Sequence, residues 1–217
     1  MSKLEIIKQH ITEQEIEAGR KKGSVKLIAV SKTKPMDQIK PVVDEGQIHF
    51  GENKVQEALL KWQEFKIRNK DIDLHLLGPL QSNKVKKVFG LFDYIHSLDR
   101  NSLAEKISDE VQKKGFCPKI FIQVNTGLEQ QKSGIEPEKL PEFLSVIRKN
   151  MDLNIVGLMC IPPINEAPEK HFKFLKNLAD KNGLLELSMG MSSDYITAIN
   201  CGATFVRVGT AIFGLRE

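Results

Sequence analysis

Apolar runs alternate with amphipathic segments along most of the chain. Residues 25–30 (VKLIAV) are apolar and rich in β-branched side chains, a composition typical of a buried parallel strand. Further runs of this kind lie at 47–50, 73–77, 93–97, 119–124, 154–158, 185–188 and 204–208. Helical spacing of apolar residues marks the segments 3–22, 53–68, 83–90, 101–114, 137–149, 166–182, 192–201 and 210–214. A further helix, which Pro41 should kink or delay, is expected after residues 25–30. The order predicts about eight strand–helix pairs after an N-terminal helix.

This number of βα repeats favours one α/β architecture. Such repeats in a chain of 217 residues are typical of a (β/α)8 TIM barrel, with a doubly wound open sheet as the alternative. No G-x-G-x-x-G follows the first predicted strand, which argues against a dinucleotide-binding sheet. No linker or low-complexity tract divides the chain. We therefore expect one domain over 1–217, with the N-terminal helix in 1–24 and the barrel in 25–217.

Composition and charge narrow the possible partners. The net charge of +4 comes from 32 basic and 28 acidic residues, without a basic run of the kind that binds nucleic acid. No apolar stretch of about 18 residues predicts a membrane span, and the charged N-terminus lacks the apolar centre of a secretory signal. Cys117, Cys160 and Cys201 are odd in number and widely spaced, which fits a reducing compartment. We expect a cytoplasmic protein that is a monomer.

A lysine directly follows the first predicted strand. In an α/β barrel, the carboxyl ends of the strands and the loops after them carry the chemistry. Lys32 lies at such an end, shortly before Pro35, which suits the first turn of a helix. An amine held at this point can form a Schiff base with an aldehyde. A solvated loop lysine is the simpler interpretation.

The loops after the last two predicted strands resemble an anion-binding site. They read S-M-G-M-S at 188–192 and R-V-G-T at 207–210. Loops at these places often bind phosphate in α/β barrels. Gly209 and Thr210 open a short helix whose N–H groups attract an anion, and the hydroxyl groups of Ser192 and Thr210 add two donors. We predict a phosphate site here.

A phosphate site facing a strand-end lysine favours pyridoxal phosphate, whose aldehyde would meet Lys32. The alternation of residues within 204–208 predicts that Arg207 points into the barrel. An arginine can only donate hydrogen bonds, so Arg207 would leave the pyridine nitrogen unprotonated. The cofactor would then be a weak electron sink. A structural salt bridge is the alternative role for Arg207.

Several stretches together resemble the pyridoxal phosphate homeostasis protein family. They cover nearly the whole chain in order: A-V-S-K-T-K-P (29–35), F-G-E-N-x-V-Q-E (50–57), H-x-x-G-P-L-Q-S-N-K (75–84), K-S-G-I (132–135), G-L-M-C-I-P-P (157–163), S-M-G-M-S-x-D (188–194) and V-R-V-G-T-A-I-F-G (206–214). One departure is Lys54, where many relatives carry tyrosine.

The resemblance implies a single barrel of the alanine racemase N-terminal type that carries pyridoxal 5'-phosphate as a covalent aldimine on Lys32. It also implies that Arg207 lies by the pyridine nitrogen. Further cofactor contacts are implied around the phosphate and the ring: Asn53, His75, Met191, Ser192, Gly209 and Thr210. Lys132, in K-S-G, resembles a family lysine tied to cofactor handling outside the main site.

Three functions are compatible with these residues. The first is a protein that carries and buffers pyridoxal phosphate and passes it to other enzymes. The second is an amino-acid racemase, but racemases of this type need a second base, a tyrosine that the resemblance places in a further β-rich domain. The chain has only Tyr94 and Tyr195, both poorly placed in the predicted elements. Losing a second base removes acid–base catalysis worth about 100- to 10,000-fold, so we favour the carrier.

The third function is a metal-dependent barrel hydrolase that uses His75 and His96. These histidines show no local ligand spacing, so we expect no metal site and expect both rings to form hydrogen bonds in or near the core.

Overall fold

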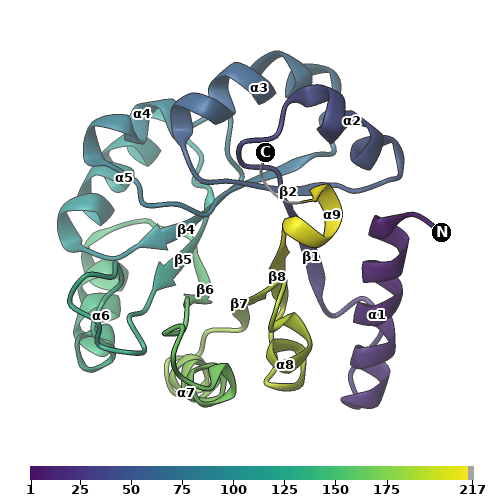
Figure 1. Ribbon diagram of the computed structural model, residues 1–217. Coiled ribbons are helices and arrows are strands. Elements are labelled where there is room, and N and C mark those ends of the chain that lie inside the picture. Colours follow the sequence, from purple (N-terminus) through teal and green to yellow (C-terminus); the bar gives the residue numbers. More distant parts are fainter. Residues whose placement is uncertain (215–217) are drawn as a thin grey trace.

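Eight parallel strands close into a barrel in sequence order, and helices surround the barrel on the outside (Figure 1). The computed structural model describes residues 1–214. The strands are β1 (Lys26–Val30), β2 (His49–Glu52), β3 (Asp73–Leu76), β4 (Tyr94–Leu98), β5 (Lys119–Gln123), β6 (Ile155–Met159), β7 (Glu186–Met191) and β8 (Phe205–Val208). β1 pairs with both β2 and β8, and Ile28 lies beside Arg207 across the closing pair. The predicted barrel is confirmed, and the doubly wound sheet is excluded because the ring of strands is closed.

The helices alternate with the strands. They are α1 (Lys3–Glu17), α2 (Met36–Asp44), α3 (Val55–Arg68), α4 (Val85–Val88), α5 (Asn101–Lys114), α6 (Leu140–Asn150), α7 (Pro168–Lys181), α8 (Tyr195–Asn200) and α9 (Thr210–Phe213), with 3-10 turns η1 (Ser82–Lys84) and η2 (Pro137–Lys139). α1 ends before the predicted position 22 because Gly19, just past its end, takes a left-handed φ of 67°. β7 continues past the predicted position 188, so the S-M-G-M segment ends a strand and is not a loop.

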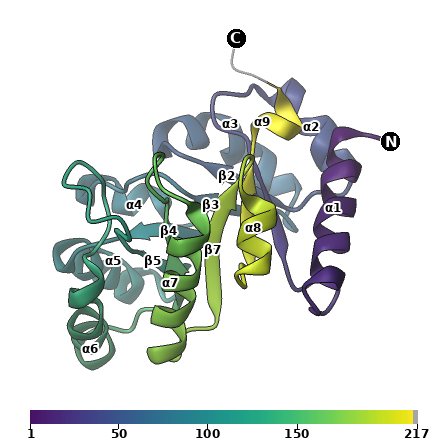
Figure 2. The ribbon, with the colours of Figure 1, turned by 60° about the horizontal axis from the view of Figure 1, so that its bottom comes forward.

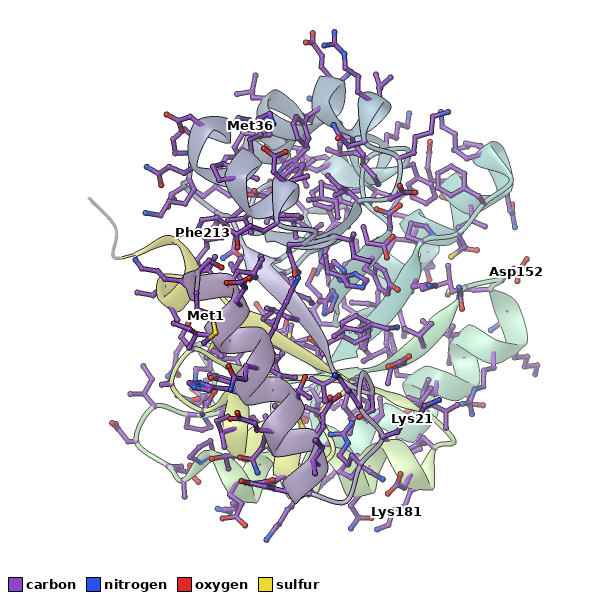
Figure 3. The ribbon with its side chains drawn as sticks, turned by 90° about the vertical axis from the view of Figure 1, so that its right-hand side faces the viewer. Met1, Lys21, Met36, Asp152, Lys181 and Phe213 are labelled. Carbon is purple, nitrogen blue, oxygen red and sulfur yellow. The ribbon has the colours of Figure 1, made fainter. Side chains whose placement is uncertain are left out.

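The N-terminal helix completes the outer ring. After β8 the described chain forms only α9, a helix of four residues. α1 packs against α8 and α9, burying Leu4, Ile7 and Ile11, and it lies between α8 and α2 in the ring (Figure 1). Figure 3 shows α1 in front of the barrel when the molecule is seen from the side of this helix, and in Figure 2 the start of α1 and α9 lie toward the same end of the molecule. α1 therefore covers the barrel beside β1 and β8.

Alternating side chains along the strands form two separate cores. Leu27 and Ala29 of β1 belong to the large core between the barrel and its helices. Successive side chains of a strand point to opposite faces, so Ile28 points into the barrel. A smaller cluster fills that interior: Ile28, Tyr94, Phe121, Met159 and Phe205. Among the helices described in residues 1–214, none combines the length and the apolar character needed to cross a bilayer.

Candidate functional site

A cavity of about 340 Å³ opens at the carboxyl ends of the strands. Its volume lies in the range of pockets that bind small organic ligands, roughly 300 to 1,000 Å³. The lining residues come from the ends of β1, β6, β7 and β8, from the segments after these strands, and from the residues that directly follow β2 and β3: Val30, Lys32, Thr33, Lys34, Asn53, Leu77, Met159, Ile161, Met191, Ser192, Ser193, Arg207, Gly209, Thr210, Phe213 and Gly214. Lys32 thus shares one cavity with Gly209 and Thr210.

The backbone is strained directly beside Lys32. Thr33 has a φ of 64°, in the left-handed region that β-branched residues rarely occupy. Its N–H group donates to Oε1 of Glu57 over 2.5 Å. A residue held in such a conformation costs about 1 to 3 kcal/mol, and it persists only where surrounding contacts impose it. The loop that carries Lys32 is therefore held in place by its neighbours.

Lys61 of α3 supplies further contacts to this loop. Its Nζ donates to the carbonyl groups of Ser31 (2.9 Å) and Lys34 (3.2 Å) and to the Glu57 carboxylate (2.8 Å). Burial raises the pKa of Glu57, but hydrogen bonds from Lys61 and from the Thr33 N–H outweigh it, so this pKa lies below its usual value. Glu57 therefore stays ionised while it holds the loop.

Glu52, at the end of β2, ties the same loop to the core. Its carboxylate is fully buried and accepts from the Ser31 hydroxyl (2.7 Å) and the Trp62 indole N–H (2.9 Å). Lys61 Nζ lies 2.8 Å from the same oxygen. We call Glu52, Glu57 and Lys61 the loop clamp. None of the three was predicted from the sequence as a functional residue, although the i, i+4 spacing of Glu57 and Lys61 in a predicted helix is a recognisable signal.

The predicted anion site has a suitable set of donors. The Gly209 N–H group donates to Ser192 Oγ over 3.4 Å, so the segments after β7 and β8 meet there. Thr210 begins α9, and the first N–H groups of a helix lack partners within the helix. Hydroxyl and N–H donors of this kind fit a phosphate.

Met191 lines the cavity, and its backbone N–H group is engaged by a neighbouring side chain. Its N–H group donates to Oδ1 of Asp194 over 2.6 Å. This contact occupies the Met191 N–H group and places the Asp194 carboxylate next to it. The S-M-G-M segment continues β7, where Gly190 has a φ of 88°, and this turn of the backbone directs the Met191 N–H toward α8.

Arg207 lies inside the barrel, as the alternation along 204–208 predicts. Only 5% of the residue is exposed. One terminal nitrogen donates to the Ser188 hydroxyl (2.8 Å) and the other to the carbonyl group of Cys160 (2.9 Å). Burial lowers the pKa of Arg207, and the nearby Asp194 carboxylate opposes this only in part. Burial also raises the pKa of the Cys160 thiol to about 12, so this thiol is neutral beside the guanidinium.

His75 does not line the cavity. It is fully buried in β3, where its ring stacks on Tyr94 with 4.1 Å between the ring centroids and forms hydrogen bonds with His49 and His96. Placing it near the cofactor ring is therefore a misassignment, caused by its side chain pointing into the barrel below the cavity. The expectation that His75 and His96 form hydrogen bonds in the core is confirmed.

Asn53 does line the cavity, and its position is tightly restricted. A Cβ atom added to Gly78 would lie 2.2 Å from the carbonyl oxygen of Asn53. Only glycine at position 78 therefore lets the loop after β3 approach the segment that carries Asn53.

Lys132 lies outside the cavity lining. Its Nζ donates to the carbonyl group of Pro162 (3.1 Å) and pairs with Glu129 (2.6 Å). The lysine thereby joins the loop after β5 to the loop after β6.

Neither tyrosine lines the cavity. Tyr94 is buried in β4, and its hydroxyl accepts from Lys119 (2.9 Å). Tyr195 lies in α8, with its hydroxyl 3.4 Å from Nδ1 of His10. Within residues 1–214, no group of three or more His, Cys, Asp or Glu side chains is placed to hold a metal ion.

Sequence comparison places the chain among known proteins. The alanine racemase N-terminal domain model matches residues 7–217. A pyridoxal phosphate homeostasis protein of Aquifex aeolicus is 41% identical over 209 residues, which are 92% of this chain and 91% of that protein.

Solved structures agree with this placement. PipY of Synechococcus elongatus with PLP bound has a TM-score of 0.81 and 39% identity, over 94% of this chain and 100% of that one. An alanine racemase of Clostridium difficile has the same fold, with a TM-score of 0.74 at 14% identity. This chain covers 57% of that racemase.

Proposed function

The chain belongs to the family of pyridoxal phosphate homeostasis proteins, and on this basis we propose that it binds, stores and releases pyridoxal 5'-phosphate. The shared cavity of Lys32 and the Gly209–Thr210 donors carries the proposal, because this cofactor has an aldehyde at one end and a phosphate at the other. The recipients would be cofactor-free pyridoxal phosphate enzymes in the cytoplasm, and the protein would act as a monomer.

Lys32 would hold the cofactor covalently. In its neutral form, the Lys32 amine would replace the C=O bond of the aldehyde with a C=N bond, and the oxygen would leave as water. The loop clamp supports this role because it restrains Ser31 and Lys34 on both sides of Lys32. Ser192, Gly209 and Thr210 would bind the phosphate.

Arg207 would face the pyridine nitrogen. A bound pyridoxal phosphate supplies electron withdrawal from the Schiff base, and this is strongest when the ring nitrogen is protonated. Arg207 can donate a hydrogen bond but offers no proton, so the ring nitrogen of the bound cofactor would stay neutral. A weak electron sink suits storage better than catalysis at the α-carbon of an amino acid.

The fold shared with alanine racemases supports a second function, amino-acid racemisation. It would require Lys32 to serve both faces of the substrate, or water to act as the second base. Neither tyrosine lines the cavity in the described part of the chain, which favours the carrier.

The absorbance spectrum of the purified protein with added cofactor tests the proposal. We expect an aldimine band, which borohydride bleaches while it fixes the cofactor on Lys32, as peptide mass spectrometry would show. Lys32→Ala should lose the band, whereas Lys34→Ala, a change two positions away in the same cavity, should retain it. A protein that does not take up the cofactor would overturn the proposal.

Deuterium exchange separates carrier from racemase. When alanine or serine is incubated with the protein in heavy water, the amino acid should keep its α-proton, even with many equivalents of protein present. Rapid exchange that depends on Lys32 would instead establish the racemase.

A further inference from the structure

A line of hydrogen-bonded side chains runs through the barrel interior below Arg207. Ser188 Oγ accepts from Arg207 and lies 2.9 Å from Nδ1 of His96. Nε2 of His96 lies 2.9 Å from Nδ1 of His75, and Nε2 of His75 lies 3.1 Å from Nδ1 of His49. We call Ser188, His96, His75 and His49 the imidazole chain. The proposed function uses none of its members.

Burying three imidazole side chains in the barrel interior costs free energy, because each ring carries polar nitrogens that lose their contact with water. His96 stacks on Phe121 with 4.4 Å between centroids. Phe205 contacts His96 and His49 edge-on and His75 at a tilt, so the surroundings are aromatic. Buried polar groups need hydrogen-bond partners, and apolar side chains of similar size often fill such space equally well. The hydrogen bonds of the imidazole chain continue without a break to the Arg207 cation at the floor of the cavity. This continuity suggests that the imidazole chain acts on Arg207.

All three rings are neutral at pH 7. Burial lowers the pKa of His75 and His96 well below the usual value, and burial with the nearby cations Lys26 and Lys119 lowers the pKa of His49 to about 4. A neutral imidazole has one N–H donor and one acceptor nitrogen. A row of three can therefore donate consistently in either direction, and its two ends decide which direction is adopted.

Arg207 favours donation away from itself. The guanidinium can only donate, so the Ser188 oxygen accepts from it. The Ser188 hydroxyl has one hydrogen to donate, and Nδ1 of His96, 2.9 Å away, gives this hydrogen an acceptor. His96 then carries its proton on Nε2, and so does His75. This order turns the lone pairs toward the buried cation, whereas the reverse order would turn N–H groups toward it.

The far end of the chain favours the reverse order. Asp73 Oδ2 lies 3.3 Å from Nδ1 of His49, and a carboxylate prefers an N–H group at that nitrogen. However, 36% of the Asp73 side chain is exposed, and burial with the neighbouring Asp93 raises the pKa of Asp73. The fully buried cation of Arg207 is less screened than Asp73, so its preference prevails.

We propose that Ser188 and His96 are positioning residues that orient the Arg207 guanidinium toward the bound ring through the fixed direction of the imidazole chain. The Ser188 lone pair holds one terminal nitrogen of Arg207 and the Cys160 carbonyl group holds the other. These two contacts restrain the plane of the Arg207 guanidinium at the cavity floor. The inference about Arg207 and the ring rests on the proposed cofactor binding, while the direction of the chain does not.

Histidine ring signals test the direction in the cofactor-free protein. With 15N-labelled histidine at pH 7, we expect His75 and His96 to be protonated on Nε2 and unprotonated on Nδ1. A proton on Nδ1 of His96, or a mixture of both tautomers, would overturn the proposal. This measurement needs no substitution and no cofactor, so it stands even if the cofactor does not bind.

Variants at position 96 test the positioning. His96→Asn keeps an acceptor for the Ser188 hydroxyl, whereas His96→Phe removes it. We expect His96→Phe to shift the absorbance maximum of the bound cofactor and to weaken binding about ten-fold, and His96→Asn to restore both. His171→Phe is the control, because it also removes a buried imidazole but His171 is not part of the imidazole chain. A folded His96→Phe protein with the wild-type spectrum would contradict the proposal.

Discussion

At the residue scale, the end of the cavity proposed to bind the phosphate is lined by neutral donors. Ser192 and Thr210 contribute hydroxyl groups, and Gly209 lies so close to β1 that an added Cβ would be 3.1 Å from the carbonyl oxygen of Val30. Neutral donors bind a phosphate without holding it as strongly as a cluster of cations would. A carrier that must release its ligand benefits from such a site.

Thr210→Val should weaken binding of pyridoxal phosphate about ten-fold, because one hydrogen bond to a charged oxygen is lost from a partly solvated site. The Schiff-base band should keep its position, since Lys32 is unchanged. Titration followed by absorbance measures both. Thr12→Val in α1 is the control, and an unchanged affinity in Thr210→Val would remove Thr210 from the site.

At the element scale, α3 determines the shape of the loop after β1. The loop clamp joins β2 and α3 to the backbone on both sides of Lys32, and it balances the strain at Thr33. Glu52 is fully buried, so the cation of Lys61 compensates a charge that has no access to water. The helix thus contributes to the site without lining it.

Lys61→Met should lower the free energy of unfolding by about 3 kcal/mol, because it leaves the buried Glu52 carboxylate without its cation. Adding Glu52→Gln should recover part of this loss. Urea denaturation of the single and double variants measures the coupling.

Lys40→Met is the matched control for this pair. It breaks an i, i+4 ion pair with Asp44 in α2, where both side chains are more than half exposed, and should change stability by about 0.5 kcal/mol or less. A Lys61→Met protein as stable as this control would show that the loop clamp contributes little.

At the scale of the whole molecule, the closed ring separates an apolar outer core from an interior that holds buried polar groups. α1 completes the outer ring where the chain after β8 forms only a short helix. The interior carries the imidazole chain from the cavity floor toward the opposite mouth of the barrel. Its neutral histidines make the stability of the barrel sensitive to acid.

The free energy of unfolding should fall as the pH is lowered from 6.5 to 4. The pKa of His49 is lowered from 6.5 to about 4 in the folded protein. Between these pH values His49 is protonated in the unfolded chain but not in the folded chain, so acid favours unfolding. His75 and His96 shift in the same direction. Urea midpoints measured across this pH range should therefore decrease steadily.

His49→Gln should reduce the pH dependence of the free energy of unfolding, because it removes one group that is protonated only in the unfolded chain. Carboxylates add their own acid sensitivity in both proteins, so the difference between the two profiles is the informative quantity. Identical profiles would mean that His49 titrates normally in the folded state.

The sequence alone determined the parts of this protein that depend on local pattern. Apolar periodicity predicted the alternating strands and helices and the barrel, and turn chemistry at the strand ends predicted Lys32 and the Gly209–Thr210 site. These features follow from neighbouring residues, and the parallel βα rule then places all strand ends at one mouth.

Only the tertiary structure decided which side chains meet across the barrel. Ser188 and His96 are 92 positions apart, and Lys61 reaches Ser31 across 30 positions. Such contacts depend on strand register and on how far along a strand each inward side chain lies. That depth placed His75 below the cavity and built the imidazole chain, and no local pattern carries this information.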